Sequence, residues 1–323
     1  MNELKITILD AATLGGDIDL SAFERYGEVE IHEYTSAADV PALSAGCDIL
    51  ITNKAPVGKD SIAASSRLKL ICVAATGANN IDIGCCREKG VAVANAAGYS
   101  TASVVQHTFS MALYLIGSTR YYDDYVRSGE YSKNKIFSHA GRPFNEIAAM
   151  KWGVIGLGAI GSGVAKIASA FGASVSYYST SGKNINGEYK SEGLDELLKS
   201  SDMVSIHAPL NEKTKDLIRY RELSMMKPSA VILNVGRGGI INETDLVRAL
   251  NEKKIRAAGL DVMESEPLAP QSPLHEVDDG ERLLITPHMA WTSVEARKRL
   301  VNEIALNIEF FLKGERRNRL DLK

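Results

Sequence analysis

Short apolar runs alternate with segments of helical periodicity along almost the whole chain. In the first third, the runs at 5–10, 47–52, 68–75 and 91–96 predict buried strands, and 20–26 and 81–88 predict helical segments between them. Further strands are predicted at 151–155, 173–179, 202–210, 230–239, 256–262 and 283–288. Because strands alternate with helices, the pattern predicts an α/β fold built on parallel sheets.

Two longer segments have helical spacing. The first, from residue 100 to about 127, predicts one continuous helix that bridges two domains. Its shared face consists of Val104, Thr108, Met111, Leu115 and Thr119. The second, at 293–314, predicts a helix with an apolar stripe at Leu300, Ile304, Ile308 and Leu312. Residues 128–150 lose this periodicity and gain turn residues, so they are expected to form a surface connection.

The composition indicates a globular protein of two domains. The chain has 323 residues, which is more than one ordinary core accommodates. A net charge of −3 provides no basic surface for nucleic acid, and no apolar stretch reaches the length of a membrane span. No signal-like segment opens the sequence, so the expected location is the cytoplasm. The four cysteines lack metal-binding spacing, so reduced thiols and no metal site are expected.

A glycine-rich turn follows the predicted strand at 151–155. Its glycines are Gly156, Gly158 and Gly161, with Ala159 and Ile160 between the last two, and a helix of small residues follows. A GxGxxG motif alone is weak evidence, but a strand before it and a helix after it are the context of a dinucleotide-binding loop. The first glycine then permits the tight turn, the second lets the pyrophosphate approach, and the third lets helix and strand pack closely. A plain tight turn is the alternative.

The next predicted strand ends in hydroxyl residues. An acidic side chain that binds the ribose of NAD is expected about 20 residues beyond the glycine loop. Here the chain has Ser179, Thr180 and Ser181, followed by Lys183. Without the carboxylate, NADP is tolerated or preferred, because nothing repels its 2′-phosphate. A hydroxyl-rich loop that still accepts NAD remains the alternative.

Three residues far apart in the chain follow predicted strands of one parallel sheet. They are Arg237, Glu266 and His288, and chemistry in such sheets gathers at the carboxyl ends of the strands. An Arg to hold a carboxylate, a His to move a proton and a Glu to orient that His form a complete set for redox chemistry at a hydroxyl carbon. His207 also ends a predicted strand, but a histidine packed near the cofactor is the simpler interpretation.

Taken together, these motifs resemble the D-isomer-specific 2-hydroxyacid dehydrogenase family over essentially the whole chain. The resemblance lies in GLGAIG (156–161), HAPL (207–210), NVGRGG (234–239), GLDVMESEP (259–267) and TPHMAW (286–291). Within that family the chain is most similar to glycerate dehydrogenases, also called hydroxypyruvate reductases. The segments that carry this similarity are TNKAP (52–56), ATGANNID (75–82), GYSTASVVQHTF (98–109) and HMAWTSVEARKRL (288–300).

The resemblance implies a fold, a reaction and a set of site residues. It implies a Rossmann-type doubly wound sheet at 100–290, inserted into a flavodoxin-like substrate domain formed by 1–99 and 291–323. It implies reduction of hydroxypyruvate to D-glycerate, or glyoxylate to glycolate, with NAD or NADP as cofactor and Arg237, Glu266 and His288 as catalytic residues. The implied substrate-binding residues are Arg237, Lys54, Thr76, Gly77, Ala78 and Trp291. Beside the glycine loop and residues 179–181, the implied cofactor-binding residues are His207, Ala208, Pro209, Thr214, Val235, Gly236, Arg237, Asp261, His288 and Ala290.

Other functions remain open at this point. The same fold serves in reductases of other 2-oxo acids, such as pyruvate or phosphohydroxypyruvate, and in nucleotide-sensing corepressors. A corepressor is disfavoured because the chain ends soon after its last predicted helix and has no low-complexity arm. The expected partners are a small 2-oxo or 2-hydroxy acid and a second copy of the chain. For that homodimer, the tyrosine-rich end of the long helix is the candidate surface, at Tyr121, Tyr122 and Tyr125.

Overall fold

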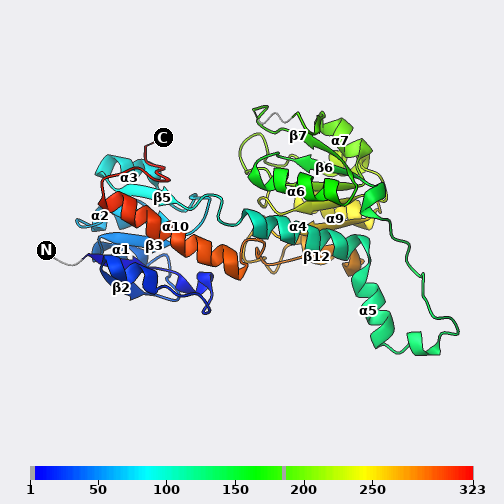
Figure 1. Cartoon of the computed structure of the whole chain (residues 1–323), viewed down its shortest axis with the longest axis horizontal. Helices are drawn as coiled ribbons and strands as arrows, with labels where there is room; N and C mark the ends of the chain where they lie inside the picture. The colour runs from blue at the N-terminus through cyan, green and yellow to red at the C-terminus, as the bar shows by residue number, and fades with distance from the viewer. Residues whose placement is uncertain (1–3, 184–186, 323) are drawn as a thin grey trace. The chain divides into compact units, whose positions relative to one another are not determined.

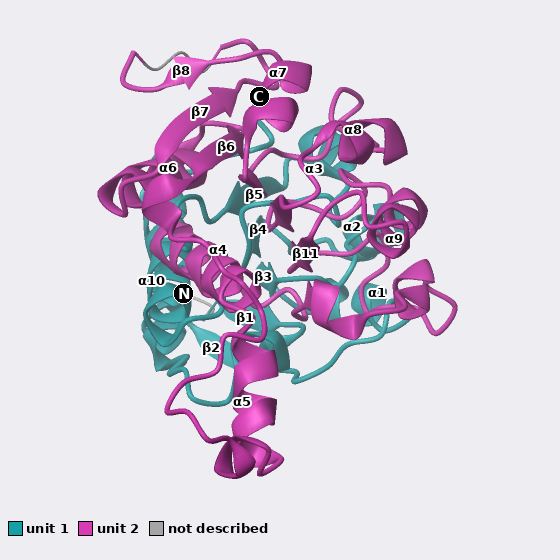
Figure 2. Cartoon of the chain, turned by 90° about the vertical axis from the view of Figure 1, so that its right-hand side faces the viewer, with its two compact units in different colours: residues 1–100, 292–323 teal, residues 101–291 magenta. Residues whose placement is uncertain are grey.

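The computed structural model describes residues 4–183 and 187–322. Within them the chain forms two compact units, shown in separate colours in Figure 2. Unit 1 consists of Met1–Ser100 and Thr292–Lys323, so it is built from both ends of the chain. Unit 2 is the intervening segment Thr101–Trp291. Each unit is organised around its own parallel sheet.

The sheet of unit 1 has the strand order β2-β1-β3-β4-β5, and all of its strand pairs are parallel. Its strands are β1 (Lys5–Ile8), β2 (Glu28–Ile31), β3 (Ile49–Thr52), β4 (Leu70–Val73) and β5 (Ala92–Asn95). This is the order of flavodoxin-like doubly wound sheets. Every residue of the central strands β3 and β4 is buried, as expected for parallel strands covered on both faces.

Helices of both terminal segments accompany this sheet (Figure 1). They are η2 (Ser21–Tyr26), α1 (Val40–Ala45), α2 (Lys59–Ala64), α3 (Ile83–Lys89) and α10 (Val294–Leu312). The last of them, α10, contacts β4 and begins at Ser293, whose side chain accepts a hydrogen bond from the N–H of Ala296. The predicted apolar stripe of α10 is buried except for Leu312, which is 46% exposed in the final turn.

The sheet of unit 2 is wholly parallel, with the strand order β12-β11-β10-β9-β6-β7-β8. Its strands are β6 (Lys151–Ile155), β7 (Ser174–Tyr178), β8 (Lys190–Ser191), β9 (Met203–Ile206), β10 (Val231–Asn234), β11 (Ala257–Leu260) and β12 (Leu283–Ile285). Its helices are α4 (Thr101–Ile116), α5 (Thr119–Arg127), α6 (Ala159–Ala170), α7 (Leu194–Ser200), α8 (Tyr220–Met225) and α9 (Glu243–Asn251). The predicted α/β class, a Rossmann-type doubly wound sheet beside a flavodoxin-like one, is confirmed.

Alternate strand residues of unit 2 contribute to two separate cores. Trp152 and Val154 of β6 pack with residues of α4 and α6, whereas Ile155 packs with residues of α7, α8 and α9. The side chain of Met111 on α4 lies directly on the sheet, because a Cβ at Gly259 of β11 would come within 3.0 Å of its methyl carbon. The helices therefore cover both faces of the sheet and leave its strand ends for the site.

The prediction of one continuous helix from residue 100 to about 127 is wrong, because the structure divides this segment into the two helices α4 and α5. Ser118 has a left-handed backbone with a φ of 48°, which no α-helix accommodates. The guanidinium of Arg256 donates hydrogen bonds to the carbonyl oxygen of Ile116 (3.0 Å) and to Oγ of Ser118 (3.1 Å). The side chain of Arg256, which directly precedes β11, thus satisfies the final carbonyl of α4, and the chain turns there.

Every strand predicted from the sequence contains an observed strand, usually with its ends trimmed. Some elements differ from expectation. The segment 20–26 forms a 3₁₀ helix at Ser21–Tyr26, and the strands β2 and β8 were not predicted. The sequence of β2, Glu-Val-Glu-Ile, has no buried residue, so its hydrophobic signal is weak. The predicted connection at 128–150 is largely irregular, with short 3₁₀ turns at Tyr131–Lys133 and Ile147–Ala149.

Candidate active site

The candidate residues of unit 2 lie in loops that leave one edge of its sheet. Because all strands are parallel, their carboxyl ends share that edge. The strand order reverses between β6 and β9, since the chain continues from β6 to β7 on one side and from β9 to β10 on the other. Ligands of doubly wound sheets bind at such a reversal. Here the glycine loop follows β6, and His207 follows β9.

The glycine loop is shaped by close contacts between backbones. Gly156 has a φ of 91°, and a Cβ there would lie 2.9 Å from the backbone nitrogen of Ala208. A Cβ on Gly161 would lie 2.1 Å from the carbonyl oxygen of Gly156. At Gly158, by contrast, a Cβ would meet nothing within 4 Å, and no side chain caps the helix α6 that begins there. This loop therefore fits the pyrophosphate of a dinucleotide, which the N–H groups of Ala159, Ile160 and Gly161 are placed to bind.

His207 is joined to the sheet through a buried hydroxyl. Its Nε2 lies 2.9 Å from Oγ of Ser205, and the same Oγ accepts a hydrogen bond from the indole N–H of Trp152 at 2.9 Å. Burial lowers the pKa of His207 to about 3, so the ring is neutral and carries one N–H. The buried Nδ1 atom has no hydrogen-bond partner among the described residues. If the Ser205 hydroxyl donates to Nε2, then Nδ1 carries the proton and is an unused buried donor.

Ser179, immediately after β7, offers a second unused polar atom. Its Oγ is buried and lacks a hydrogen-bond partner within the described part of the chain. The carbonyl oxygen of Ser179 accepts a hydrogen bond from the N–H of Gly182, which closes a turn over Thr180 and Ser181. Oγ of Ser181 accepts from the N–H of Lys183 at 3.2 Å. Serine therefore occupies the strand end where the ribose-binding carboxylate of NAD-specific sheets lies.

His288 and Glu266 are in direct contact. Nδ1 of His288 lies 2.7 Å from Oε2 of Glu266, and the other oxygen of that carboxylate accepts a hydrogen bond from the N–H of Met263 at 3.1 Å. His288 has a φ of 51°, and its N–H bonds to the carbonyl oxygen of Asp261. The pair holds the ring through Nδ1, so Nε2 is the nitrogen available to a substrate. The side chain of His288 is 22% exposed, so a small molecule has access to it.

Asp261 fixes the loop that carries His288. Its carboxylate accepts hydrogen bonds from Oγ1 of Thr286 (2.6 Å) and from the N–H groups of Met289 and Ala290 (both 2.9 Å). Burial alone would raise the pKa of this carboxyl, but hydrogen bonds from His107, Thr286 and the backbone outweigh burial and lower it. The structure thus gives Asp261 a capping function, and within the described residues Oδ2 accepts a hydrogen bond only from Ala290, which leaves one lone pair.

Arg237 lies in the loop after β10. The side chain of Asn234 shapes this loop, because it donates to the carbonyl oxygen of Arg237 (2.8 Å) and accepts from the N–H of Gly236 (3.1 Å). A Cβ on Gly238 would lie 1.8 Å from the carbonyl oxygen of Met263, so the loops of Arg237 and Glu266 touch through their backbones. The only hydrogen bond of the Arg237 guanidinium within the described residues goes to the carbonyl oxygen of Gly236 (2.7 Å). Its charge therefore has no carboxylate partner there.

The remaining predicted cofactor positions line these same loops. The hydroxyl of Thr214 is used within its own loop, where it donates to the carbonyl oxygen of Pro209 at 2.6 Å and accepts from the N–H of Asn211. Thr214 therefore holds the HAPL segment in shape. Ala208, Val235 and Ala290 are buried, and Pro209 is exposed. Trp291 is partly buried and packs against the core of α4 and α6.

The predicted substrate residues of unit 1 follow strands β3 and β4. Among the described residues, none accepts a hydrogen bond from the backbone N–H groups of Thr76, Gly77 and Ala78. Two side-chain hydrogen bonds hold this loop in place. Oγ1 of Thr76 donates to the carbonyl oxygen of Ala96, and Nδ2 of Asn95 donates to the carbonyl oxygen of Thr76. Three neighbouring unused N–H groups are a suitable cradle for an anion.

Two residues of these sites were not predicted from the sequence. Asp10, two residues after the end of β1, accepts hydrogen bonds from the N–H groups of Asn53, Lys54 and Ala55, at 2.8, 2.6 and 3.0 Å. Asp10 therefore fixes the backbone position of Lys54. Its sequence position, an acidic residue near the end of a predicted strand, was the signal from which it could have been found. His107 of α4 contacts Thr286 (3.0 Å) and Asp261 (3.4 Å), and only its place in a family-like segment pointed to it.

Comparisons with known proteins agree with this geometry. Residues 109–290 match the NAD-binding domain of the D-isomer specific 2-hydroxyacid dehydrogenases. The chain is 35% identical over 319 residues to a hydroxypyruvate reductase of Blautia hydrogenotrophica, covering 96% of this chain and 98% of the relative. It is 32% identical over 318 residues to a glycerate dehydrogenase of Methylorubrum extorquens, covering 97% and 98%.

Solved structures show the same relationship. A D-lactate dehydrogenase from Aquifex aeolicus, complexed with NAD and lactic acid, has a TM-score of 0.82 and 26% identity, with 96% of each chain covered. An acyclic imino acid reductase in complex with NADPH and D-arginine has a TM-score of 0.86 and 29% identity, covering 98% of this chain and all of the other. The sites define an NAD-dependent oxidoreductase of 2-hydroxy acids. The chain belongs to the D-isomer specific 2-hydroxyacid dehydrogenase family.

No helix within residues 4–183 and 187–322 is long and apolar enough to cross a membrane. In the same part of the chain, no group of three or more His, Cys, Asp and Glu side chains is placed to hold a metal ion.

Proposed function

We propose that the protein reduces hydroxypyruvate to D-glycerate, and glyoxylate to glycolate, with NADH or NADPH. The observation that carries this proposal is the 2.7 Å contact between Nδ1 of His288 and Oε2 of Glu266, at the same edge of the sheet as the glycine loop that follows β6. The substrate class is supported by relatives that cover almost the whole chain and are named hydroxypyruvate reductase and glycerate dehydrogenase. A glyoxylate reductase of Aeropyrum pernix is 36% identical over 262 residues, 79% of this chain and 77% of the relative.

Each of these residues has a separate role in the proposed reaction. A bound nicotinamide supplies hydride to C2 of the 2-oxo acid. Nε2 of His288 donates a proton to the developing alkoxide, while Glu266 stabilises the protonated ring and keeps its orientation. Arg237 binds the substrate carboxylate and the oxo oxygen with its planar fork, which accounts for its uncompensated charge. In the oxidative direction His288 accepts the proton from the hydroxyl group.

We assign substrate binding to unit 1 and cofactor binding to unit 2. In unit 1, the N–H groups of Thr76, Gly77 and Ala78 are proposed to bind the substrate carboxylate, and Lys54 is proposed to contact the substrate. Arg237 and Trp291 are the residues of unit 2 that are proposed to contact the substrate as well. In unit 2, Asp261 is proposed to bind the carboxamide of the nicotinamide through its remaining lone pair. Nδ1 of His207 is proposed to donate to the cofactor.

NADP is proposed to be accepted as well as NAD. The support is Ser179, whose buried Oγ has no partner in the described residues and which replaces a carboxylate that would repel the 2′-phosphate. Thr180, Ser181 and Lys183 add further donors after the same strand.

One assay tests the reaction. Oxidation of NADH and of NADPH is followed against hydroxypyruvate, glyoxylate, pyruvate and phosphohydroxypyruvate. The proposal predicts the highest kcat/KM with hydroxypyruvate, substantial turnover of glyoxylate and measurable rates with both cofactors. A preference for pyruvate or phosphohydroxypyruvate would overturn the substrate assignment, and binding of cofactor without turnover would favour a nucleotide-sensing protein.

A homodimer is proposed from the exposed apolar residues that follow α4. Helix α5 has no buried residue, and with the loop after it projects from the rest of unit 2 (Figures 1 and 2). The large exposed apolar side chains of this region are Val126, Tyr131, Ile136, Phe137 and Phe144. Apolar patches of this kind mark interaction surfaces, and a second copy of the chain is the commonest partner.

Light scattering tests the dimer. The wild type is expected at about twice its mass of 34.9 kDa, and Phe137→Asp is expected to favour the monomer. Tyr34→Asp places the same charge on an exposed aromatic residue of unit 1 and serves as the control. A monomeric wild type would contradict the proposal. The cytoplasmic location stays a prediction, to be tested by cell fractionation.

A further inference from the structure

Unit 2 has a pocket of about 540 Å³ that lies apart from the proposed active site. Part of its wall is formed by Ser229, which precedes β10, and by Arg256, which precedes β11. Both positions lie at the amino ends of strands, whereas Arg237 and Glu266 follow the carboxyl ends. A four-residue parallel strand spans about 13 Å, so the length of the sheet separates the two places.

The charges of this pocket are unbalanced. Four arginines and two carboxylates line it, namely Arg120, Arg142, Arg256, Arg282, Asp279 and Glu281. Each guanidinium nitrogen of Arg282 already donates a hydrogen bond, to the carbonyl oxygens of Arg256, Leu250 and Ile255. Asp279 accepts from the N–H of Glu281 in its own turn. The groups that remain to meet a ligand are therefore mainly cationic.

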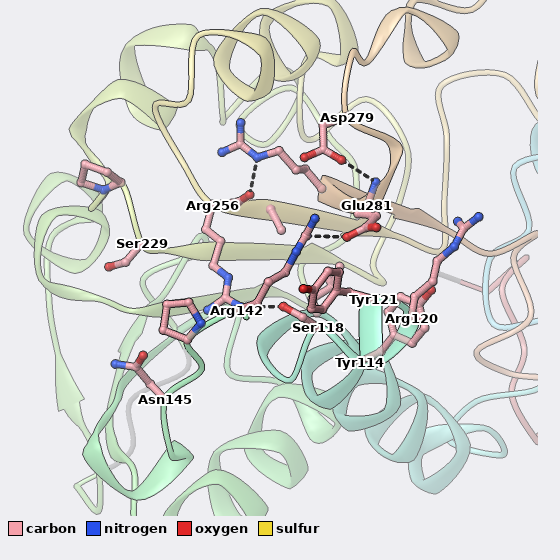
Figure 3. Close-up of a pocket in the computed structure, with 15 residues that line it drawn as sticks. Tyr114, Ser118, Arg120, Tyr121, Arg142, Asn145, Ser229, Arg256, Asp279 and Glu281 are labelled. Atoms are coloured by element: carbon pink, nitrogen blue, oxygen red, sulfur yellow. Dashed lines mark hydrogen bonds and ion pairs between the residues drawn. The ribbon is translucent and has the colours of Figure 1, made fainter. Parts of the chain in front are cut away.

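Arg142 is held in the pocket by four interactions. Its backbone N–H donates to Oη of Tyr122 (3.2 Å), and its carbonyl oxygen accepts from the same hydroxyl (2.6 Å). Its guanidinium lies over the ring of Tyr121, 4.5 Å from the centroid, and forms an ion pair with Glu281. Figure 3 shows that ion pair inside the pocket. The guanidinium is thus placed in advance and needs little ordering to bind an anion.

Arg256 lies close to Arg142 but has no carboxylate partner within the described residues. One of its nitrogens, Nη2, donates to the end of α4, at Ile116 and Ser118, as Figure 3 shows for Ser118. Burial and then the nearby charge of Arg142 lower the pKa of Arg256. A second cation and a partly buried position both disfavour its charged form. An anion between the two guanidinium groups would remove that repulsion and use the free nitrogens of Arg256.

We propose that this pocket is a second ligand site, which binds a small oxyanion carrying phosphate or carboxylate groups between Arg142 and Arg256. Guanidinium groups match both anions through paired N–H···O bonds. The carboxylate of Glu281 competes for Arg142, so it sets the affinity of the site. Asn145 and Ser229 supply further polar groups along the wall.

Calorimetric titration with inorganic phosphate, and separately with succinate, tests the site. NADH is kept saturating so that phosphate does not enter the glycine loop. Arg256→Gln is expected to weaken binding by about tenfold or more, because charge-assisted hydrogen bonds are lost. Glu281→Gln is expected to tighten it about threefold to tenfold, because Arg142 loses its competing partner. The titrant that binds more tightly identifies the preferred oxyanion.

Arg248→Gln is the matched control, because it removes an exposed arginine of unit 2 that is paired with Glu252. It is expected to leave the affinity unchanged. The opposite signs expected for Arg256→Gln and Glu281→Gln cannot arise from general destabilisation, and Glu281→Gln remains informative if loss of Arg256 prevents folding. The proposal is overturned if neither anion binds the wild type, or if Glu281→Gln fails to tighten binding.

Discussion

Nδ1 of His288 lies 2.7 Å from Oε2 of Glu266, although the residues belong to loops that follow different strands. The carboxylate is fixed in turn, since its other oxygen accepts a hydrogen bond from the N–H of Met263. This arrangement occupies Nδ1 and leaves Nε2 as the ring nitrogen for the proposed proton transfer. The Glu266–His288 pair therefore relates the sheet topology to the proposed reaction.

Glu266→Gln tests whether the carboxylate supports the protonated histidine. An amide carries no charge, so it cannot stabilise the imidazolium that donates the proton in the proposed reaction. The alkaline limb of kcat/KM for reduction is therefore expected to move towards lower pH. Glu264→Gln, which removes an exposed carboxylate two residues away, is the control and should keep the wild-type profile. An unchanged profile in Glu266→Gln would show that this carboxylate is only structural.

Arg237→Lys tests the substrate anchor. The ammonium keeps the charge but cannot hold a carboxylate and a carbonyl oxygen together, so kcat/KM is expected to fall by about 10² or more. Arg219→Lys, at an exposed arginine paired with Asp216, should have no effect. Full efficiency in Arg237→Lys would exclude a bidentate role for Arg237.

Ser179→Asp tests how the loop after β7 recognises the cofactor. A carboxylate beside the 2′-phosphate is expected to shift the ratio of kcat/KM values towards NADH by about thirtyfold, or about 2 kcal/mol, and less at high salt. Ser174→Asp adds the same charge at the exposed start of β7 and should leave the ratio alone. The account of this loop fails if the wild type already prefers NADH a hundredfold, on the order of 3 kcal/mol, and Ser179→Asp changes nothing.

Ser205→Ala tests the link between Trp152 and His207. Without the hydroxyl, nothing holds the proton of the His207 ring on Nδ1, and the affinity for NADH is expected to fall about threefold to tenfold. Nitrogen NMR of His207 should show protonated Nδ1 in the wild type and a mixture of tautomers in the variant. Ser201→Ala removes another buried hydroxyl of unit 2, which donates to Leu197, and should change neither quantity. A wild-type ring protonated on Nε2 would refute the assignment.

Much of this organisation follows from local sequence patterns. The strands and the glycine loop are visible because their apolar runs and small residues are contiguous. The contact between Glu266 and His288 was also expected, since both follow strands of one parallel sheet. The sequence could not reveal the break between α4 and α5, because Arg256, which satisfies the end of α4, lies 138 residues from Ser118. Helix propensity alone predicts a helix end poorly where a side chain distant in sequence forms hydrogen bonds with that end.

Other features depend on tertiary contacts that no motif encodes. His107 contributes to the hydrogen bonds of Asp261 from 179 residues before Thr286, which it also contacts. The hydroxyl of Thr214 forms hydrogen bonds within its own loop, and Asp10 accepts hydrogen bonds from three backbone N–H groups. Only the distances in the structure revealed these partners. His107 lies in a segment that resembles the family, but its hydrogen-bond partners could be identified only from the three-dimensional structure.

His288 is the residue on which the proposed chemistry depends most directly. Its φ of 51° is unfavourable for alanine, so His288→Asn accompanies His288→Ala, because asparagine tolerates the left-handed region. Both variants retain the glycine loop, Arg237 and the remaining binding groups. Any loss of turnover that they share is therefore due to the missing proton donor and not to backbone strain.

The decisive measurement is kcat for hydroxypyruvate reduction by the wild type, His288→Ala and His288→Asn, with the Kd for NADH measured on the same samples. General acid catalysis predicts that kcat falls by about 10² to 10⁴ in both variants while the Kd changes less than about threefold. A kcat near that of the wild type in His288→Asn, with cofactor binding intact, would contradict the account.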